Sequence, residues 1–97
     1  MATYIALLHY TDQGIRNVKD TVKRAAAAKD VAAKMGVKLT ELFWTLGQYD
    51  LALIAEAPDE ETMTALMLKL AALGNVKSQT LRAFRSKEME TLLQKAS

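Results

Sequence analysis

A three-residue connection between two apolar segments is the feature that most constrains how this chain can fold. The segments VKLTELFWTL, residues 37–46, and DLALIAEA, residues 50–57, are separated only by the residues GQY. If both segments are strands, a connection this short forces them to pair as an antiparallel hairpin. Gly47 lies in the connection, where it can supply a positive φ that other residues rarely adopt. The centre of the chain is therefore predicted to be a β-hairpin.

Patterns on the N-terminal side of this hairpin predict a strand and a helix. Residues 3–10, TYIALLHY, are rich in β-branched and aromatic residues and are followed by the polar, turn-prone segment TDQG. From Ile15 onward, apolar residues recur at intervals of three and four. This periodicity predicts one long amphipathic helix, and Gly36 is placed to end it.

Patterns on the C-terminal side predict a helix, a strand and a second helix. Pro58 and the acidic residues 59–61 mark a helix start, because proline is tolerated in the first turn and acids suit its positive end. The apolar stripe of this helix ends before Gly74. The segments VKSQTLRAF, residues 76–84, and SKEMETLLQKA, residues 86–96, then predict a strand and a short closing helix.

The order of these elements defines the predicted fold class, which is α+β. It is a ferredoxin-like βαββαβ arrangement with a short C-terminal helix. Right-handed crossovers would place the four strands in one antiparallel sheet with both main helices on the same face. No linker, low-complexity segment or block of charge divides the chain. Residues 1–97 are therefore expected to form a single domain.

Two of the strands carry more apolar surface than one layer of helices can cover. The runs IALL and LALIA have apolar residues at consecutive positions, so these strands require burial on both faces. Helices cover only one face, and 51% of the residues are hydrophobic, which is more than a lone small domain easily hides. A second copy of the chain is the simplest source of a covering sheet. The sequence therefore predicts a homodimer, or a higher homo-oligomer, with the architecture of a dimeric α+β barrel.

Composition excludes several classes of partner and chemistry. Thirteen basic and eleven acidic residues leave a net charge of only +2, which is too small a field to favour nucleic acid or a membrane surface. Aromatic and basic residues are not interleaved as on an RNA-binding sheet. The chain has no cysteine, and no apolar run approaches about 18 residues. Without a signal-peptide pattern at the N-terminus, a cytoplasmic location is the default expectation.

Three segments of the chain resemble the GYD-domain family. They read HYTDQGIRNVKDT at the first strand-to-helix junction, WTLGQYDLALIAEAPDEE in the centre and LGNVKSQTLRAF at the last strand. The central motif takes the form Gly47-x-Tyr49-Asp50, and the similarity extends from about Tyr4 to Phe84. The resemblance implies a dimeric α+β barrel, in agreement with the burial argument. The family has no agreed catalytic residues to carry over, so the resemblance implies little about function.

The polar residues of the central motif have a structural and a functional interpretation. Asp50 can accept backbone N–H bonds across the turn, and Tyr49 can lay its ring over the end of the sheet. In a ligand-binding role the phenol would donate a hydrogen bond, and the carboxylate would accept one or act as a base. We favour the structural role for Asp50 and leave the role of Tyr49 open.

His9 is the only histidine, and it lies near the end of the first predicted strand. A lone histidine at a strand end is more often solvated or hydrogen-bonded than catalytic, and zinc sites require several converging ligands. We therefore expect no metal site and no cofactor. A haem held by one histidine stays open, but only by analogy with related barrel folds.

The TDQG segment, residues 11–14, precedes the long predicted helix and also has two interpretations. Thr11, Asp12 and Gly14, together with free backbone amides at the start of the helix, could bind an anion. Asp12 is also a competent N-cap that would occupy those amides. We favour the cap.

Arg82 and Arg85 lie on opposite sides of the last predicted strand, so only one of them can face a pocket. An interior arginine is expected to pair with a carboxylate. The candidate partners are Glu41, Asp50 and Glu56. Trp44 is interpreted mainly as a packing residue.

Two classes of function are consistent with these features. The first is a small homo-oligomeric binding or accessory protein that holds a small apolar or anionic molecule between sheet and helices, or inside the dimer barrel. The alternative is a cofactor-independent enzyme of oxygenase or isomerase type with His9, Tyr49 or Asp50 as acid and base. The enzyme needs two of these groups within about 3–4 Å of one bound molecule. We favour the binding protein. The candidate ligand-binding residues are His9, Thr11, Trp44, Tyr49, Asp50 and Arg82.

Overall fold

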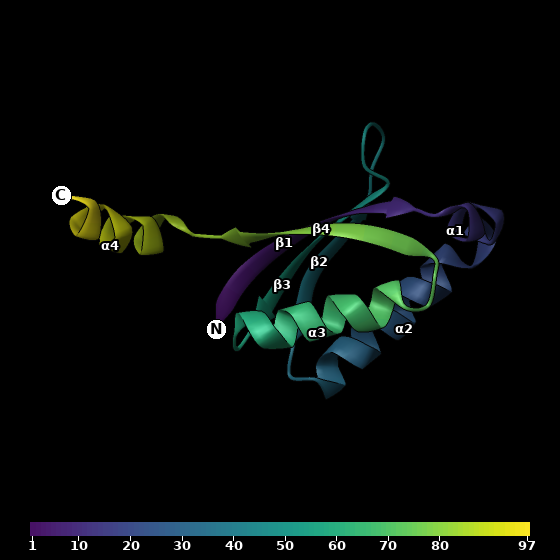
Figure 1. The fold of residues 1–97 in the computed structure, drawn as a ribbon, viewed down its shortest axis with the longest axis horizontal. Coiled ribbons are helices and arrows are strands. Elements are labelled where there is room, and N and C mark those ends of the chain that lie inside the picture. Colours follow the sequence, from purple (N-terminus) through teal and green to yellow (C-terminus); the bar gives the residue numbers. More distant parts are fainter.

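The computed structural model describes residues 1–97 and confirms the predicted fold class (Figure 1). The elements are β1 (Ala2–Tyr10), α1 (Asp12–Arg16), the 3₁₀ helix η1 (Val18–Asp20), α2 (Thr21–Lys34), β2 (Lys38–Trp44), β3 (Leu51–Ala57), α3 (Glu60–Ala71), β4 (Val76–Ala83) and α4 (Ser86–Ala96). The strands form one sheet in the order β2-β3-β1-β4, and every neighbouring pair is antiparallel. This is the ferredoxin-like arrangement expected from the element order.

Helices α2 and α3 pack on one face of the sheet and enclose the core between them and the strands (Figure 1). Alternate residues of β1 and β3 point toward these helices, because successive side chains of a strand project to opposite faces. The main buried residues are Tyr4, Ala6, Leu8, Leu51, Leu53 and Ala55 of the strands, and Ala32, Met63 and Leu66 of the helices. The sequence did not decide which face of β1 looks at the helices, and this pattern decides it.

The prediction of one long helix after β1 was wrong, because the segment is divided into α1, η1 and α2. The division lies at Asn17, whose φ of −103° and ψ of 24° are not helical. The Asn17 carbonyl accepts hydrogen bonds from the Asp20 amide at 3.0 Å and from Arg24 Nη1 at 2.7 Å. Asparagine is a weak helix former, so these bonds can hold it outside the helix. Apolar periodicity continues across the break and therefore gave no signal of it.

The central hairpin is present, but its loop is longer than the three residues expected. β2 ends at Trp44 and β3 begins at Leu51, so residues 45–50 form the loop. The Thr45 amide donates to the carbonyl of Asp50 at 2.8 Å and closes it. Gly47 has a φ of +128°, which confirms the predicted positive φ.

The C-terminal helix α4 has the predicted bounds, but it stands apart from the other helices, beyond the end of the sheet (Figure 1). It begins with a capping box in which the Arg85 amide donates to Glu88 Oε1 at 3.0 Å. Its apolar residues Met89 and Leu93 are 46% and 58% exposed. The apolar side of α4 therefore has little to pack against within its own chain.

Candidate functional site

The six candidate ligand-binding residues do not form one site. His9, Tyr49 and Asp50 lie at the hairpin end of the sheet, Trp44 lies beside the start of α2, and Thr11 and Arg82 border a groove between α3 and β4. The face of the sheet opposite α2 and α3 is called the open face below. It carries His9, because His9 alternates with the helix-facing Leu8.

His9 and Tyr49 form a contact on this open face. Their ring centroids are 4.7 Å apart, and the rings are tilted by 33°. The Tyr49 hydroxyl donates a hydrogen bond to Gln79 Oε1 at 3.0 Å, so the side chain spans from the hairpin to β4. Tyr49 thus lies over the end of the sheet, as its structural interpretation predicted.

Asp50 extends the pairing of β1 with β3 toward the hairpin. Its Oδ2 accepts a hydrogen bond from the backbone amide of Tyr10 at 2.8 Å. Its own amide donates to the carbonyl of Leu8 at 2.9 Å. The backbone-capping role favoured for Asp50 is therefore present, although the donor lies on β1 rather than in the turn itself. Asp50 Oδ2 and the Tyr49 phenol are thus both engaged in hydrogen bonds within the chain.

Trp44 lies on the helix-facing side of β2, away from His9 and Tyr49. Its Nε1 donates to the hydroxyl of Thr21 at 3.0 Å. The same hydroxyl is 2.8 Å from the hydroxyl of Tyr10. Thr21 is the first residue of α2. Trp44 and Tyr10 thus connect the start of α2 to the ends of β2 and β1. This contact matches the packing role expected for Trp44.

Thr11 rather than Asp12 caps the first helix, so that prediction was wrong. The Thr11 hydroxyl accepts the Gly14 amide at 3.1 Å and donates to the carbonyl of Gly74 at 2.5 Å. Thr11 has the extended conformation that an N-cap requires, whereas Asp12 is already helical. The Thr11 amide also donates to the carbonyl of Asn75 at 3.0 Å. These bonds join α1 to the start of β4.

Arg82 faces the helix side of β4, and its carboxylate partner is not among the three that the sequence suggested. Its Nη2 lies 3.5 Å from Glu88 Oε2 of α4, and its Nη1 donates to the carbonyls of Thr3, at 3.3 Å, and Ala83. Glu56, one of the suggested partners, instead pairs with Arg85 at 3.3 Å. The pairing with Glu88 depends on how α4 leaves the sheet, which the strand pattern does not encode.

The surroundings of Glu88 favour its charged form. The main cause is the backbone amide of Arg85, which donates to this carboxylate and lowers the pKa of Glu88 below its usual value. The positive charge of Arg82 acts in the same direction. Glu88 therefore holds the first turn of α4 against the end of β4.

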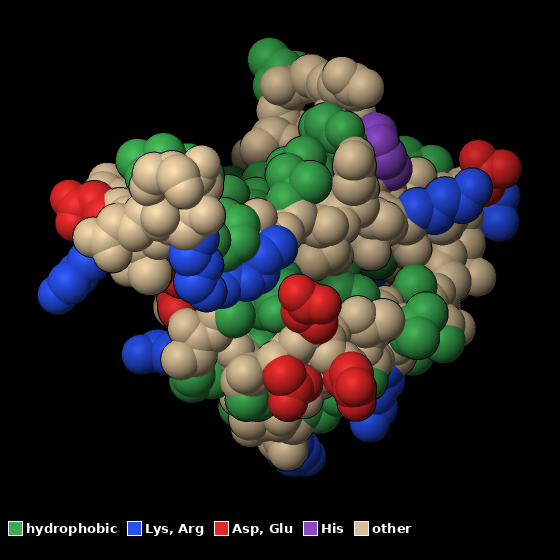
Figure 2. Space-filling model, turned by 60° about the vertical axis from the view of Figure 1, so that its left-hand side comes forward, with side chains coloured by type: hydrophobic (Ala, Val, Ile, Leu, Met, Phe, Trp, Pro, Cys, Tyr) green, Lys and Arg blue, Asp and Glu red, His purple; other side chains and the backbone are tan.

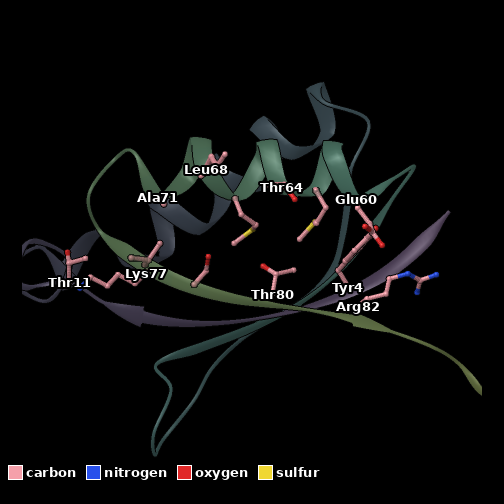
Figure 3. A pocket seen from close by; sticks show the side chains of 13 residues that line it. Tyr4, Thr11, Glu60, Thr64, Leu68, Ala71, Lys77, Thr80 and Arg82 are labelled. Atoms are coloured by element: carbon pink, nitrogen blue, oxygen red, sulfur yellow. The ribbon is translucent and has the colours of Figure 1, made fainter.

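A groove lies between α3 and β4 (Figure 3). The sequence offered a space between sheet and helices as one of two alternatives for a pocket, but it did not single out α3 and β4. The volume of the groove is about 760 Å³. Met63 and Met67 line it from α3, while Ser78 and Thr80 line it from β4. Thr11 and Arg82 lie at opposite ends. The helix-facing side of β4 carries small polar residues, whereas the other strands carry apolar ones there. This difference was the available sequence signal for the groove.

The structure contains no group of three or more His, Cys, Asp or Glu side chains arranged to hold a metal ion. No helix has the length and apolar character needed to cross a membrane.

Comparison with known proteins identifies relatives along nearly the whole chain. The GYD domain family model matches residues 4–93. A protein of Thermus thermophilus named "Glutamine synthetase and cystathionine beta-lyase binding protein" is 34% identical over 84 residues, which cover 86% of this chain and 88% of that protein.

Solved structures share the fold at lower identity. TTHA0845 from Thermus thermophilus superposes with a TM-score of 0.58 at 23% identity, covering 89% of this chain and 96% of that one. The protein FFRP-DM1 gives a TM-score of 0.60 at 19% identity, covering 87% and 100%. An ACT domain protein from Streptococcus pneumoniae gives 0.50 at 16% identity, covering 86% and 90%. These likenesses support the ferredoxin-like fold.

Proposed function

This chain belongs to the GYD-domain family, and we propose that it is a small homo-oligomeric binding protein that attaches to other proteins. The relative from Thermus thermophilus supports this proposal, since its name describes a protein that binds two enzymes. The similarity extends over most of both chains, which supports a shared kind of activity. The proposal includes the single domain over residues 1–97 and the cytoplasmic location expected from the sequence.

The open face of the sheet carries the homo-oligomer part of the proposal. The strand register places Ile54, Ile5 and Leu81 in one row across β3, β1 and β4. A second row contains Phe43, Ala52 and Leu7. Phe43 and Leu81 are 51% and 42% exposed, which is high for large apolar side chains. Figure 2 shows hydrophobic side chains gathered between α4 and the single histidine.

Polar pairs border these two rows at both ends of the open face. At one end Thr3 donates to Glu56 Oε1 at 3.1 Å, and Glu56 pairs with Arg85. At the other end His9 lies opposite Lys77 in the register. An apolar centre with a polar rim is the usual anatomy of a protein interface. We propose that a second copy of the chain covers this face, because a two-fold axis lets the same surface serve both partners.

Helix α4 adds support for association between copies. It extends past the sheet with Met89 and Leu93 exposed, and one salt bridge and one capping bond, both made by Glu88, hold its first turn. An amphipathic helix is stabilised mainly by packing its apolar side. We propose that α4 packs on the neighbouring copy, where it would bury these residues.

The protein-binding part of the proposal can be tested by sedimentation velocity with purified enzymes. Glutamine synthetase and cystathionine β-lyase from the organism that supplies this chain would each be mixed with it, beside an unrelated enzyme of similar size. We expect the chain to co-sediment with at least one of the two and not with the unrelated enzyme. Co-sedimentation with neither would contradict a partner choice shared with the relative.

A further inference from the structure

We propose that the groove between α3 and β4 binds an uncharged, largely apolar small molecule that presents a carbonyl or hydroxyl oxygen to Tyr4. This inference concerns a small ligand and goes beyond the protein partner proposed above. The volume of about 760 Å³ lies within the range of about 300–1,000 Å³ that is usual for ligand sites.

The hydroxyl of Tyr4 is the observation that carries the proposal. Tyr4 is only 4% exposed, and its hydroxyl is buried without a hydrogen-bond partner. Buried hydroxyls are nearly always paired, because an unpaired one loses its bonds to water and gains none in return. Tyr4 lines the groove, and Figure 3 shows its side chain rising from β1 toward α3. A ligand oxygen in the groove would supply the missing partner.

The neighbouring side chains can adapt to such a ligand. Met63 and Met67 of α3 line the same groove, and methionine is the apolar residue that repacks most readily around a bound molecule. A small shift of these side chains would bring a ligand into contact with the enclosed Tyr4 hydroxyl. Leu68 and Val76 extend the apolar lining. The groove therefore suits a long, narrow apolar molecule.

The polar lining is rich in hydroxyl groups that have no other role. The side chains of Thr64, Ser78 and Thr80 line the groove, and none of their hydroxyls bonds to another group of the chain. Figure 3 shows Thr64 and Thr80 on opposite walls. Hydroxyls can donate or accept, so they serve ketones and alcohols equally well.

The charges around the groove disfavour an anion. Arg82 is already engaged by Glu88 and by the carbonyls of Thr3 and Ala83. Lys77 and Glu60 are the other charged residues that line the groove. Their charges are opposite and offset each other, so they leave no excess of positive charge for an anion. An uncharged ligand fits this balance best.

Methionine methyl NMR of the full chain tests the proposal with three probes of equal chain length: decanone, decanol and decanoate. The five methionines are reporters, of which only Met63 and Met67 line the groove. We expect saturable shifts of these two signals with the ketone and the alcohol, several-fold weaker binding of decanoate, and unmoved signals from Met1, Met35 and Met89. The absence of a saturable shift with all three probes, or tighter binding of decanoate, would overturn the proposal.

Two variants and one control variant locate the contact. Tyr4→Phe removes the unpaired hydroxyl and should weaken ketone binding about threefold to tenfold, while thermal stability stays equal or rises. Thr64→Trp should fill the groove and abolish the shifts, whereas Lys69→Trp, on the same helix outside the groove, should retain them. Unchanged affinity in Tyr4→Phe would end the assignment of the hydroxyl. The protein-partner proposal is judged by sedimentation alone, so the two can fail separately.

Discussion

Replacement of Asp50 by alanine should destabilise the fold, because the carboxylate supports the backbone where β1 ends. The substitution removes the acceptor of the Tyr10 amide, which Asp50 Oδ2 binds at 2.8 Å in a part-buried position. The amide of residue 50 keeps its own bond to the Leu8 carbonyl, so only one bond is lost. A buried donor left without its partner costs about 1–3 kcal/mol. For a domain of this size that corresponds to a fall in Tm of roughly 5–20 °C.

Thermal unfolding followed by circular dichroism is the assay, and three further variants calibrate it. Asp50→Asn keeps an acceptor oxygen and should lose less than Asp50→Ala. Tyr49→Phe loses only an exposed bond to Gln79, so we expect a fall in Tm of no more than about 4 °C. Asp30→Ala, on the exposed surface of α2 and without a side-chain hydrogen bond, should leave Tm nearly unchanged.

An unchanged Tm in Asp50→Ala would refute this reasoning, because the Tyr10 amide would then be shown to need no partner. A second result would also count against it. If Tyr49→Phe or Asp50→Asn kept its Tm but lost co-sedimentation with a partner enzyme, the pair would have a binding role that its contacts do not explain.

Three other substitutions test separate parts of the account by thermal unfolding. Gly14→Ala should cost about 1–3 kcal/mol or more, because a Cβ there would lie 1.9 Å from the carbonyl oxygen of Asn75; full stability would show that α1 does not pack this closely on β4. Gly47→Val should lower the free energy of unfolding by about 1–3 kcal/mol because of the φ of +128° alone, since a Cβ added at Gly47 would meet no atom within 4 Å beyond its chain neighbours; an unchanged Tm would mean that the loop needs no glycine. Asp59→Ala should lower Tm at neutral pH, because the bonds from Thr62 lower the pKa of Asp59 in the folded state. This stabilisation is present above the usual pKa of 3.8 and is lost as the pH falls through the lower folded value, so the Tm difference should shrink there; a constant difference would contradict the assignment.

The fold was predictable because the patterns that determine it involve residues close together in the sequence. The apolar periodicities set each element, and the short central connection fixed the hairpin, which leaves few topologies for four strands and two helices. The break at Asn17 was not predictable in the same way. It depends on Arg24, seven residues further along, reaching back to the Asn17 carbonyl. Periodicity records which side of a helix is apolar, and it is insensitive to such a bond.

The candidate residues were predictable one by one but not as a site. The role of Asp50 followed from its place at a turn, because such residues commonly bond to nearby backbone. The groove arises from the spacing of α3 above β4, and that spacing is a tertiary property. Arg82 illustrates the same limit, since its partner Glu88 lies on a helix whose direction no local pattern determines.

Sedimentation equilibrium at micromolar concentrations tests the central claim, that the open face of the sheet joins two copies of this chain. The unmodified protein should have the mass of a dimer or a multiple of it. Leu81→Lys places a charge in the apolar row formed with Ile5 and Ile54 on that face and should yield monomers. Val22→Lys, at an exposed position on α2, should leave the dimer intact. A stable monomer of the unmodified protein, or a dimer that Leu81→Lys leaves intact, would contradict the claim.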